Sequence, residues 1–338
     1  MSQRRVTIVE IAKEAGVSAQ TVSRVVNGRT NVAEETREKI QAIIDRLGYH
    51  PSRLARSLLQ GRSHTIGVVG YGLGLYGPSQ TLAGILRKAN QQGYSVLPYM
   101  LNDPQPADPG QIIGELFEYH VDGIVWAVPE IGDNRAWVSD IMAEQDIPFV
   151  FMSMEPRPEL TVARVDNRAG GQMAAQHLIE RGCATIGLIQ GQQDWWEARE
   201  RELGWREALT RHGLPIDEAL IRPGDWSATA GERAMRELFQ SQPAIDGVFV
   251  CNDSMAIGAL KVAREFGRRV PDDVAIVGFD DMPEAAYFHP ALTTVRQDLY
   301  DLGCRTVVEL DALINIDHDG ARPSSILIKP ALIVRDSA

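Results

Sequence analysis

From residue 64 onward, the sequence alternates short apolar runs with amphipathic stretches of helical periodicity. The apolar runs are TIGVVG, YSVLPYM, GIVWAV, PFVFMS, TIGLIQG, GVFVCND and VAIVGFDD, and helical stretches such as GERAMRELFQ and SMAIGALKVAREFG lie between them. Strands that alternate with helices form parallel sheets with helices on both faces. The pattern therefore predicts a doubly wound α/β architecture, in which ligands bind beyond the carboxyl ends of the strands.

The charge of this 338-residue chain is unevenly distributed, and its length allows two or three domains. Of 34 basic and 45 acidic residues, residues 1–64 contain eleven and six, a net charge of +5; the remainder contains 23 and 39, a net charge of −16. A small basic module ahead of a large acidic one suggests a nucleic-acid-binding head on a separate domain.

No segment of the sequence is typical of a membrane or secreted protein. No apolar run approaches the roughly 18 residues that span a bilayer, and the N-terminal MSQRRVTIVEIAKEAG lacks a signal-peptide pattern. Three widely separated cysteines support neither a disulfide framework nor a zinc site. We therefore expect a cytoplasmic protein with no membrane partner.

The segment VTIVEIAKEAGVSAQTVSRVVNG predicts two short helices around a tight turn. Thr7 is the expected N-cap of the first helix, Gly16 supplies the turn, and Ser18 can cap a second helix over residues 19–26. A third helix follows in AEETREKIQAIIDRLGY, with Gly48 at its C-cap. Three short helices with a glycine turn between the first two form a helix-turn-helix pattern.

The expected second helix exposes side chains that suit contacts with DNA. Arginine and glutamine can bind guanine and adenine bidentately, and a short alanine can meet a thymine methyl group. Hydroxyl and amide groups can fix the register by bonding to phosphates. The candidates are Thr7, Ser18, Ala19, Gln20, Thr21, Ser23, Arg24 and Asn27. The alternative interpretation is a solvated polar face on an ordinary helical subdomain.

The sequence YHPSRLARSLLQGRS predicts a connector with a specific role. Leu54 and Leu58 would share one face of a short helix over residues 53–60, and Arg53 lies beside them. Eight residues are too few for a stable isolated helix in water, so we expect the connector to become helical only when a partner orders it. A plain linker would not need the paired leucines.

The run VTIVEIAKEAGVSAQTVSRVVNG, followed by VAEETREKI and LGYHPSRLARSL, resembles the N-terminus of the lactose-repressor (LacI) family of transcription regulators. The resemblance continues through DNRAGGQMAAQHLIERG, GDWSATAG, CNDSMAIGAL, VPDDVAIVGFDD and PALTTVRQD. It implies that Ala19, Gln20 and Arg24 read bases at a pseudo-palindromic operator. It also implies that Leu58, with its mate in a homodimer, wedges into the minor groove.

The resemblance further implies a small all-α helix-turn-helix domain followed by an α/β periplasmic-binding-protein-like (type I) core of two doubly wound subdomains. The expected boundaries are 1–50 for the helix-turn-helix domain, 51–62 for the connector and 63–338 for the core, whose N-subdomain spans about 63–165 and 298–325 and whose C-subdomain spans about 166–295 and 326–338. No leucine-heptad tail follows the last strand, so we expect a dimer.

Gly72, Gly74 and Gly77 match G-x-G-x-x-G directly after an apolar run, which is the fingerprint of a dinucleotide site. In such a site the third glycine lies within the first helical turn. Pro78 follows that glycine at once, and we expect it at the first position of a helix that starts after the glycines. The glycines are therefore expected in a loop, and we predict no nicotinamide or flavin cofactor.

The expected ligand cleft combines a cation, a carboxylate, amides and aromatic rings. Arginine can bind vicinal hydroxyls, carboxylate and amide oxygens can accept from them, and a tryptophan face suits the C–H face of a pyranose. By resemblance the first strand–helix junction forms one lip of the cleft. The candidates are Tyr71, Leu75, Pro78, Ser153, Trp196, Arg201, Trp226, Asn252, Asp280 and Gln297, with Trp195 as a further aromatic near the cleft.

Ser153 departs from the pattern that the resemblance implies, because an aspartate is usual after the fourth strand. A serine cannot supply the same charge-assisted hydrogen bond, so the ligand or its anomeric group is expected to differ.

The sequence thus predicts a DNA-binding repressor whose operator affinity is controlled by a small sugar, a hexose or a glycoside, in the cleft. A co-repressor-dependent regulator with a nucleobase-like or phosphorylated ligand is the alternative. An extracytoplasmic sugar-binding protein or an enzyme is a further one, but no G-x-S-x-G or H-E-x-x-H motif is present. DHDG at residues 317–320 is interpreted as a surface turn, so no metal is predicted.

Overall fold

The computed structural model forms two compact units, Met1–Ser63 and His64–Ala338, and each is described by itself. The residues that the structure describes are 6–26, 31–49, 62–142, 147–316 and 324–338. The division between the units falls at the end of the expected connector.

The smaller unit contains the helices α1 (Ile8–Ala15), α2 (Ala19–Val26) and α3 (Glu34–Leu47). Thr7 caps α1 in a capping box with Glu10, whose backbone N–H donates to the threonine hydroxyl at 3.3 Å. Gly16 ends α1 in the left-handed conformation, with φ 72°. Ser18 accepts from the backbone N–H of Thr21 at 3.1 Å where α2 begins. The helix-turn-helix prediction is confirmed, caps included.

The larger unit contains two six-stranded sheets, in the orders β11-β5-β4-β3-β1-β2 and β12-β10-β9-β8-β6-β7. The strands of the first are β1 (Thr65–Gly70), β2 (Ser95–Met100), β3 (Gly123–Ala127), β4 (Phe149–Met152), β5 (Val162–Val165) and β11 (Ser325–Ile328). Those of the second are β6 (Ile186–Ile189), β7 (Ile221–Arg222), β8 (Gly247–Val250), β9 (Ala275–Asp280), β10 (Thr293–Arg296) and β12 (Ala331–Ile333). Neighbouring strands run parallel except for β12, which is antiparallel to β10. The predicted doubly wound α/β core is confirmed.

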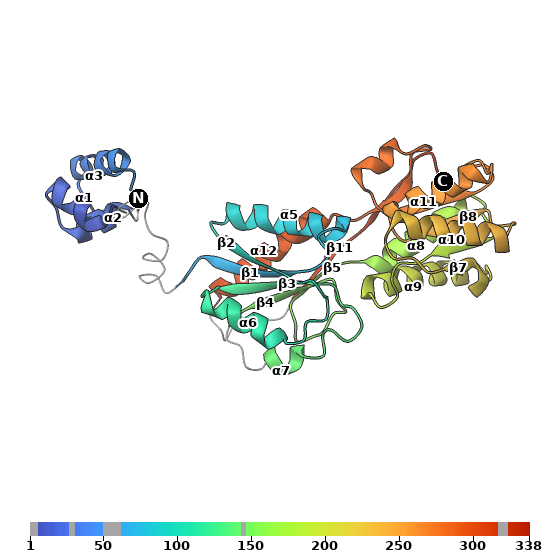
Figure 1. Ribbon diagram of the computed structural model, residues 1–338, viewed down its shortest axis with the longest axis horizontal. Helices are drawn as coiled ribbons and strands as arrows, with labels where there is room; N and C mark the ends of the chain where they lie inside the picture. Colours follow the sequence, from blue (N-terminus) through green and yellow to red (C-terminus); the bar gives the residue numbers. More distant parts are fainter. Residues whose placement is uncertain (1–5, 27–30, 50–61, 143–146, 317–323) are drawn as a thin grey trace. The chain divides into compact units, whose positions relative to one another are not determined.

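Helices cover both sheets (Figure 1). On the first sheet, α5 (Tyr76–Gln91) and α12 (Leu299–Asn315) cover one face, and α6 (Pro109–Glu118) and α7 (Val138–Met142) lie on the other. Two helix pairs pack against the second sheet: α8 (Asn167–Glu180) with α9 (Trp196–Arg211), and α10 (Ala228–Ser241) with α11 (Asp253–Glu265). The same unit contains the short 3₁₀ helices η1 (Glu218–Leu220) and η2 (Pro283–Tyr287).

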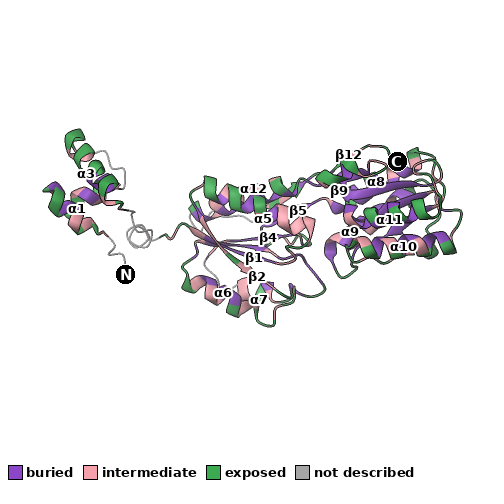
Figure 2. Ribbon diagram, turned by 45° about the horizontal axis from the view of Figure 1, so that its top comes forward, coloured by how far each residue is buried: buried purple, intermediate pink, exposed green. Residues whose placement is uncertain are grey.

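The strands read as continuous apolar runs because both of their faces are covered. In β1, Ile66 and Val68 pack with α5 and α12, whereas Val69 joins the cluster under α6. Figure 2 shows the same division, with buried strands inside and exposed outer faces on the helices.

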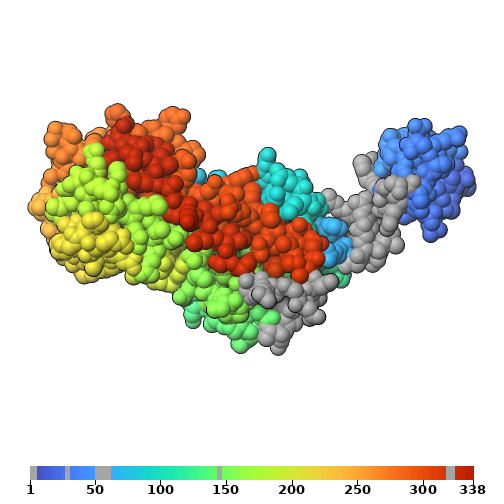
Figure 3. All heavy atoms as spheres, turned by 180° about the vertical axis from the view of Figure 1, so that it is seen from behind, coloured from blue at the N-terminus to red at the C-terminus, as the bar shows by residue number. Residues whose placement is uncertain are grey.

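The chain passes between the two sheets three times, after β5, after β10 and between β11 and β12. In Figure 3 the C-terminal residues, coloured red, run from one subdomain onto the other. The first sheet extends three residues beyond the approximate subdomain boundary expected at residue 325, because Ser325–Ile328 pairs with β5 along its whole length. Residues 326–328 therefore belong to the first sheet, where their backbone groups find partners.

The prediction that Pro78 takes the first position of a helix that starts after the glycines is wrong. Helix α5 begins at Tyr76, so Gly77 lies inside its first turn and Pro78 is its third residue. The first four N–H groups of a helix have no intrahelical partner, so proline loses no hydrogen bond there. The carbonyl four residues earlier, which the ring would meet within a helix, belongs to Gly74 outside it.

Three helix pairs cross at glycines on both sides of the contact. A Cβ on Gly84 of α5 would overlap the carbonyl oxygen of Tyr300 in α12, and a Cβ on Gly303 would overlap that of Thr81. The same reciprocal arrangement joins α8 to α9 through Gly171 and Gly204, and α10 to α11 through Gly231 and Gly258. The backbones of each pair touch, so neither helix can carry a side chain at the crossing.

We expect Gly84→Ala to lower the free energy of unfolding by about 1–3 kcal/mol, because the new methyl group would force α5 and α12 apart. Gly114→Ala in α6 is the matched control, since a Cβ there meets nothing within 4 Å. That change should stabilise the protein by about 0.5–1 kcal/mol. Urea denaturation of both variants tests the difference, and an equal response would contradict the glycine-crossing account.

Candidate functional site

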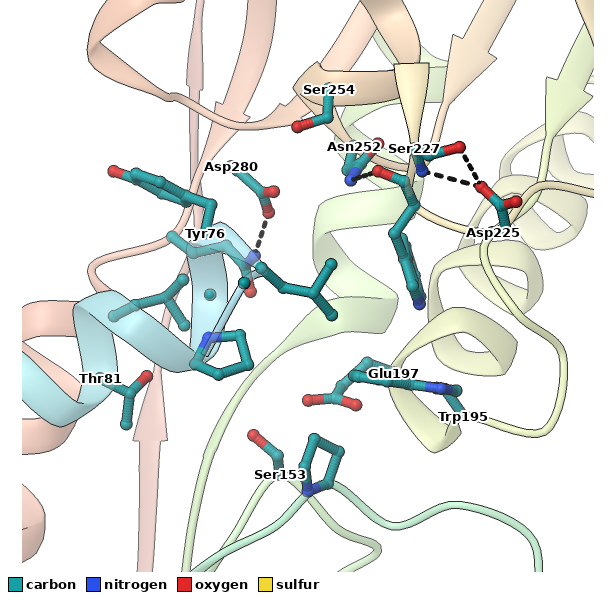
Figure 4. Close-up of a pocket in the computed structure, with 18 of the residues that line it drawn as sticks. Tyr76, Thr81, Ser153, Trp195, Glu197, Asp225, Ser227, Asn252, Ser254 and Asp280 are labelled. Carbon is teal, nitrogen blue, oxygen red and sulfur yellow. Dashed lines mark hydrogen bonds between the residues drawn. The ribbon is translucent and has the colours of Figure 1, made fainter. Parts of the chain in front are cut away.

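A cavity of about 420 Å³ lies between the two subdomains of the core (Figure 4). Small-molecule sites typically measure about 300–1,000 Å³. The cavity is lined by the N-terminal ends of α5, α9, α10 and α11, by Ser153 directly after β4, by Asp280 at the end of β9, and by the chain segment between β10 and α12. These are the positions beyond the carboxyl ends of parallel strands where ligands bind in such folds.

Eight of the ten expected ligand residues line this cavity, namely Leu75, Pro78, Ser153, Arg201, Trp226, Asn252, Asp280 and Gln297. The prediction that Tyr71 and Trp196 line the cleft is wrong, because neither is among the described lining residues. Tyr71 packs its ring against Trp195, with centroids 6.4 Å apart. Trp196 is buried beside the guanidinium of Arg164. Trp195 is the N-cap of α9 and lines the cavity in place of its neighbour.

Arg201 is fixed within the site by neighbours on several sides. Its Nε donates to Asn167 Oδ1 at 2.8 Å, and its Nη1 donates to the carbonyl of Cys251. The guanidinium carbon lies 3.9 Å from the centroid of the Phe279 ring, and Nη1 lies 3.9 Å from Asp280 Oδ1. Because arginine has five N–H donors, these contacts leave donors for a ligand.

Asp280 ends β9 inside the cavity and accepts from Gln297 Nε2 at 2.6 Å. Burial raises the pKa of Asp280 to about 6, although Arg201 and the Gln297 hydrogen bond act in the opposite direction. With this pKa the carboxylate is mostly ionised at neutral pH and can accept hydrogen bonds from a ligand.

Three cavity residues adopt positive φ values that side chains rarely take. Ser153 has φ 54°, Trp226 has φ 73° and Asp280 has φ 116°. Each such conformation costs on the order of 1–3 kcal/mol and persists only where the surroundings enforce it, commonly at functional sites. These strained backbone conformations occur where the three side chains line the cavity, and they lower the stability of the folded protein.

Asn252 has a structural role that the sequence did not indicate. Its Oδ1 accepts from the backbone N–H of Met255 at 2.8 Å and thereby caps α11. Its Nδ2 donates to the carbonyl of Trp226 at 3.0 Å. The amide thus ties the start of α11 to the segment that presents Trp226 to the cavity.

Glu197 lines the cavity and was missed by sequence reasoning. It lies in the first turn of α9, and Figure 4 shows it near Ser153, which comes from the other subdomain. Burial raises the pKa of Glu197, while the charge of Arg201 and a hydrogen bond with Ser153 lower it. The sequence offered only an acidic residue at a helix N-terminus, a place where acidic residues are common for helix stability alone.

The candidate DNA-binding residues of the small unit fall into three groups. Ala19, Gln20 and Arg24 are exposed on α2. Thr21 and Ser23 are partly buried there, and the hydroxyls of Thr7 and Ser18 already serve as helix caps. Asn27, Arg53 and Leu58 lie outside the described residues, as do most of the connector and the DHDG segment, so the roles assigned to them stay predictions.

Within the described ranges, no cluster of three or more His, Cys, Asp or Glu side chains could bind a metal ion. No helix in those ranges is long and apolar enough to cross a membrane.

Comparison with known proteins agrees with this architecture. The family model of bacterial regulatory proteins of the lacI family matches residues 7–52, and that of the periplasmic binding protein-like domain matches residues 175–338. The transcriptional regulator CelR of Thermobifida fusca is 34% identical, over 99% of both chains. The lactose operon repressor of Escherichia coli is 33% identical, over 98% of this chain and 90% of its own. The transcriptional repressor PurR of Klebsiella pneumoniae is 34% identical, over 98% and 96%.

Solved structures resemble the whole chain. The lac repressor dimer bound to operator and the anti-inducer ONPF has a TM-score of 0.89 at 31% identity, covering 99% of both chains. The CelR–cellobiose complex has a TM-score of 0.73 at 32% identity, covering 99% of this chain and 100% of its own. These relatives are transcriptional regulators and not enzymes. The chain belongs to the LacI family of DNA-binding transcriptional repressors.

Proposed function

We propose that this protein represses transcription as a dimer and that a small neutral sugar, bound in the cavity between its subdomains, lowers its affinity for operator DNA. The observation that carries the proposal is the pairing of Arg201 with Asp280 inside a cavity that also presents the Trp226 ring. Hydroxyl groups both donate and accept, so a polyhydroxylated ligand can satisfy a cation and a carboxylate together.

The charges in the cavity favour a neutral ligand over a phosphorylated one. The positive charge of Arg201 faces Asp280, and Glu197 adds a second acidic group to the lining. A phosphate placed there would meet like charges, which carry an energetic penalty at short range. Leu75, Pro78 and Trp226 provide apolar surface for the C–H faces of a sugar ring. The cellobiose complex of CelR supports a sugar as the ligand class.

The proposed control works through the two subdomains. Ser153 and Leu75 come from the first, and Arg201 and Asp280 from the second, so a ligand that bonds to both favours one relative arrangement. A ligand shifts an equilibrium only by the difference in its affinity for the two states. We propose that the arrangement favoured by the sugar is one in which the two helix-turn-helix domains of the dimer no longer fit the operator.

We expect a sugar that binds the cavity to weaken operator binding by about 5–150-fold, the usual range of allosteric coupling. Fluorescence anisotropy of labelled operator DNA, titrated with protein at several sugar concentrations, measures this change. Unchanged operator affinity at saturating sugar would refute the proposed control, and tighter binding would favour the co-repressor alternative.

We expect Arg24→Ala to reduce the preference for operator over random DNA by about 1–3 kcal/mol, because the exposed guanidinium of α2 can contact a guanine edge bidentately. Lys39→Ala in α3 is the matched control; it also removes one exposed positive charge but should leave the preference unchanged. Competition binding with operator and random duplexes tests both variants. An equal loss of affinity for the two DNAs in Arg24→Ala would argue for a phosphate contact instead.

We expect sugar affinity to fall at acid pH. With the Asp280 pKa at about 6, the free carboxylate becomes protonated as the pH drops through that value and accepts hydrogen bonds less well. Affinity should be nearly constant from about pH 8 to 7 and fall by up to about tenfold per pH unit below 6. Isothermal titration calorimetry provides the profile, and Asp280→Asn should lose most of the dependence. Equal affinities at about pH 8 and at a pH well below the Asp280 pKa of about 6 would contradict this role of Asp280.

A further inference from the structure

A loop of the first subdomain, residues 128–135 directly after β3, reaches into the core of the second subdomain. Ile131 of this β3 loop is only 3% exposed and belongs to the apolar cluster that contains Trp195 and Trp226. Among the described residues, the other buried members of that cluster lie between Ala174 and Ala338 and belong to the second subdomain. Burial of an apolar side chain is favourable, so Ile131 attaches one subdomain to the other.

Backbone hydrogen bonds continue this contact across the subdomain boundary. Ile131 and Trp195 face each other in an isolated antiparallel β-bridge. The backbone N–H of Gly132 donates to the carbonyl of Asp194 at 2.9 Å. Gly132 has a φ of 56°, a conformation that glycine adopts without strain, and the turn it makes presents this donor to the second subdomain.

A second hydrogen bond of the bridge completes the start of α9. The backbone N–H of Trp196 donates to the carbonyl of Glu130 at 2.9 Å. Trp196 is the first residue of α9, and the first four N–H groups of a helix have no partner within the helix. The start of α9, which carries Trp195 and Glu197 into the cavity lining, thus depends on a carbonyl of the other subdomain.

The β3 loop is held firmly by its own subdomain through Asn134, which is only 6% exposed. The Oδ1 atom of Asn134 accepts from the backbone N–H of Ile131 at 3.1 Å. Its Nδ2 donates to the carbonyls of Pro129 and Pro104, each at 2.9 Å. Because these partners all belong to the first subdomain, the loop must move with that subdomain and cannot follow the second one.

The bridge lies away from one of the covalent crossings between the subdomains. Gln297 belongs to the crossing between β10 and α12 and donates to Asp280 at 2.6 Å. In Figure 4, Asp280 and Trp195 lie at opposite ends of the cavity. Chain crossings permit rotation of two bodies about them, whereas a second contact at the far end restrains that rotation.

We propose that the β3 loop is a releasable latch, which holds the two subdomains in the arrangement described and keeps Trp195 and Glu197 in place at its end of the cavity. Ile131 and Asn134 are outside the described cavity lining, so they act as positioning residues. The latch itself is independent of what the cavity binds. Its effect on ligand affinity rests on the proposed sugar-binding function.

Four variants of the full-length protein test the latch. Ile131→Ala removes the inserted side chain, Asn134→Ala removes the bonds that shape the loop, and Ile131→Val is the conservative variant. Ile113→Ala is the matched control, because Ile113 is 2% exposed and packs in the cluster under α6, within the first subdomain. Thermal unfolding checks that each variant is folded at the temperature of the experiment.

The direct measurement is hydrogen–deuterium exchange with fragmentation that resolves single amides. The N–H groups of Trp196 and Gly132 are bonded across the subdomain boundary, so their exchange reports opening of the latch. We expect both amides to exchange about tenfold or more faster in Ile131→Ala and Asn134→Ala. In Ile131→Val and Ile113→Ala the rates should stay within about threefold of the wild type.

Calorimetry then measures affinity for whichever of cellobiose, lactose, glucose and galactose the wild type binds most tightly. We expect affinity to fall by about threefold or more in Ile131→Ala and Asn134→Ala, because the start of α9 is no longer preorganised. Ile113→Ala should match the wild type.

Each contrary result has a distinct meaning. Unchanged exchange of Trp196 and Gly132 in both alanine variants of the loop, or equally fast exchange in Ile113→Ala, would overturn the latch. Faster exchange with unchanged sugar affinity would overturn the positioning of the cavity residues. If the wild type binds none of the four sugars, the proposed function is contradicted, while the exchange rates still decide whether the latch exists.

Discussion

The ligand site depends on three backbone contacts between glycines that lie outside the cavity lining. Each contact brings two helices so close that neither can slide along the other without collision. The helices joined in this way are α5 with α12, α8 with α9 and α10 with α11, and the lining includes residues at the N-terminal ends of most of them. Helix N-termini carry unpaired N–H groups and partial positive charge, which suits hydroxyl and carboxylate oxygens. The close packing of the helix pairs thus places the polar groups of their N-terminal ends around the cavity.

The cavity combines several features that are locally unfavourable. Ser153, Trp226 and Asp280 have positive φ values, and Glu197 Oε2 and Trp226 Nε1 find no hydrogen-bond partner in the part of the chain that the structure describes. Proteins commonly depart from locally favourable structure at functional sites, where a ligand or a reaction uses the strained groups. Ser153 follows a strand of the first subdomain, whereas Trp226, Asp280 and Glu197 belong to the second, so a ligand that fills the cavity would contact residues of both.

Local rules predicted much of the fold and of the site. Thr7, Gly16 and Ser18 mark helix ends through short-range hydrogen bonds, so their roles can be deduced from the sequence alone. Asn252 and Asp280 were found because strand ends in a parallel sheet share one edge, whereas Leu75 and Pro78 were found from the resemblance to the family. The wrong predictions concern the exact start of a helix and the packing between subdomains, which local sequence patterns do not determine. Trp195 lines the cavity and Trp196 does not, and the two differ by one position at the start of α9. Helix α5 begins two residues before Pro78. Glu197 lies in the cavity because of how the two subdomains meet.

We propose that the cavity and the helix-turn-helix domain share one conformational equilibrium. Coupling of this kind is reciprocal, so whatever factor a sugar imposes on operator affinity must also appear in the affinity for the sugar. The most direct measurement is calorimetric titration of the preferred sugar into the free protein and into the protein saturated with operator DNA. We expect weaker sugar binding in the operator complex, by the same factor that the sugar imposes on DNA binding. Identical sugar affinity with and without operator would contradict it.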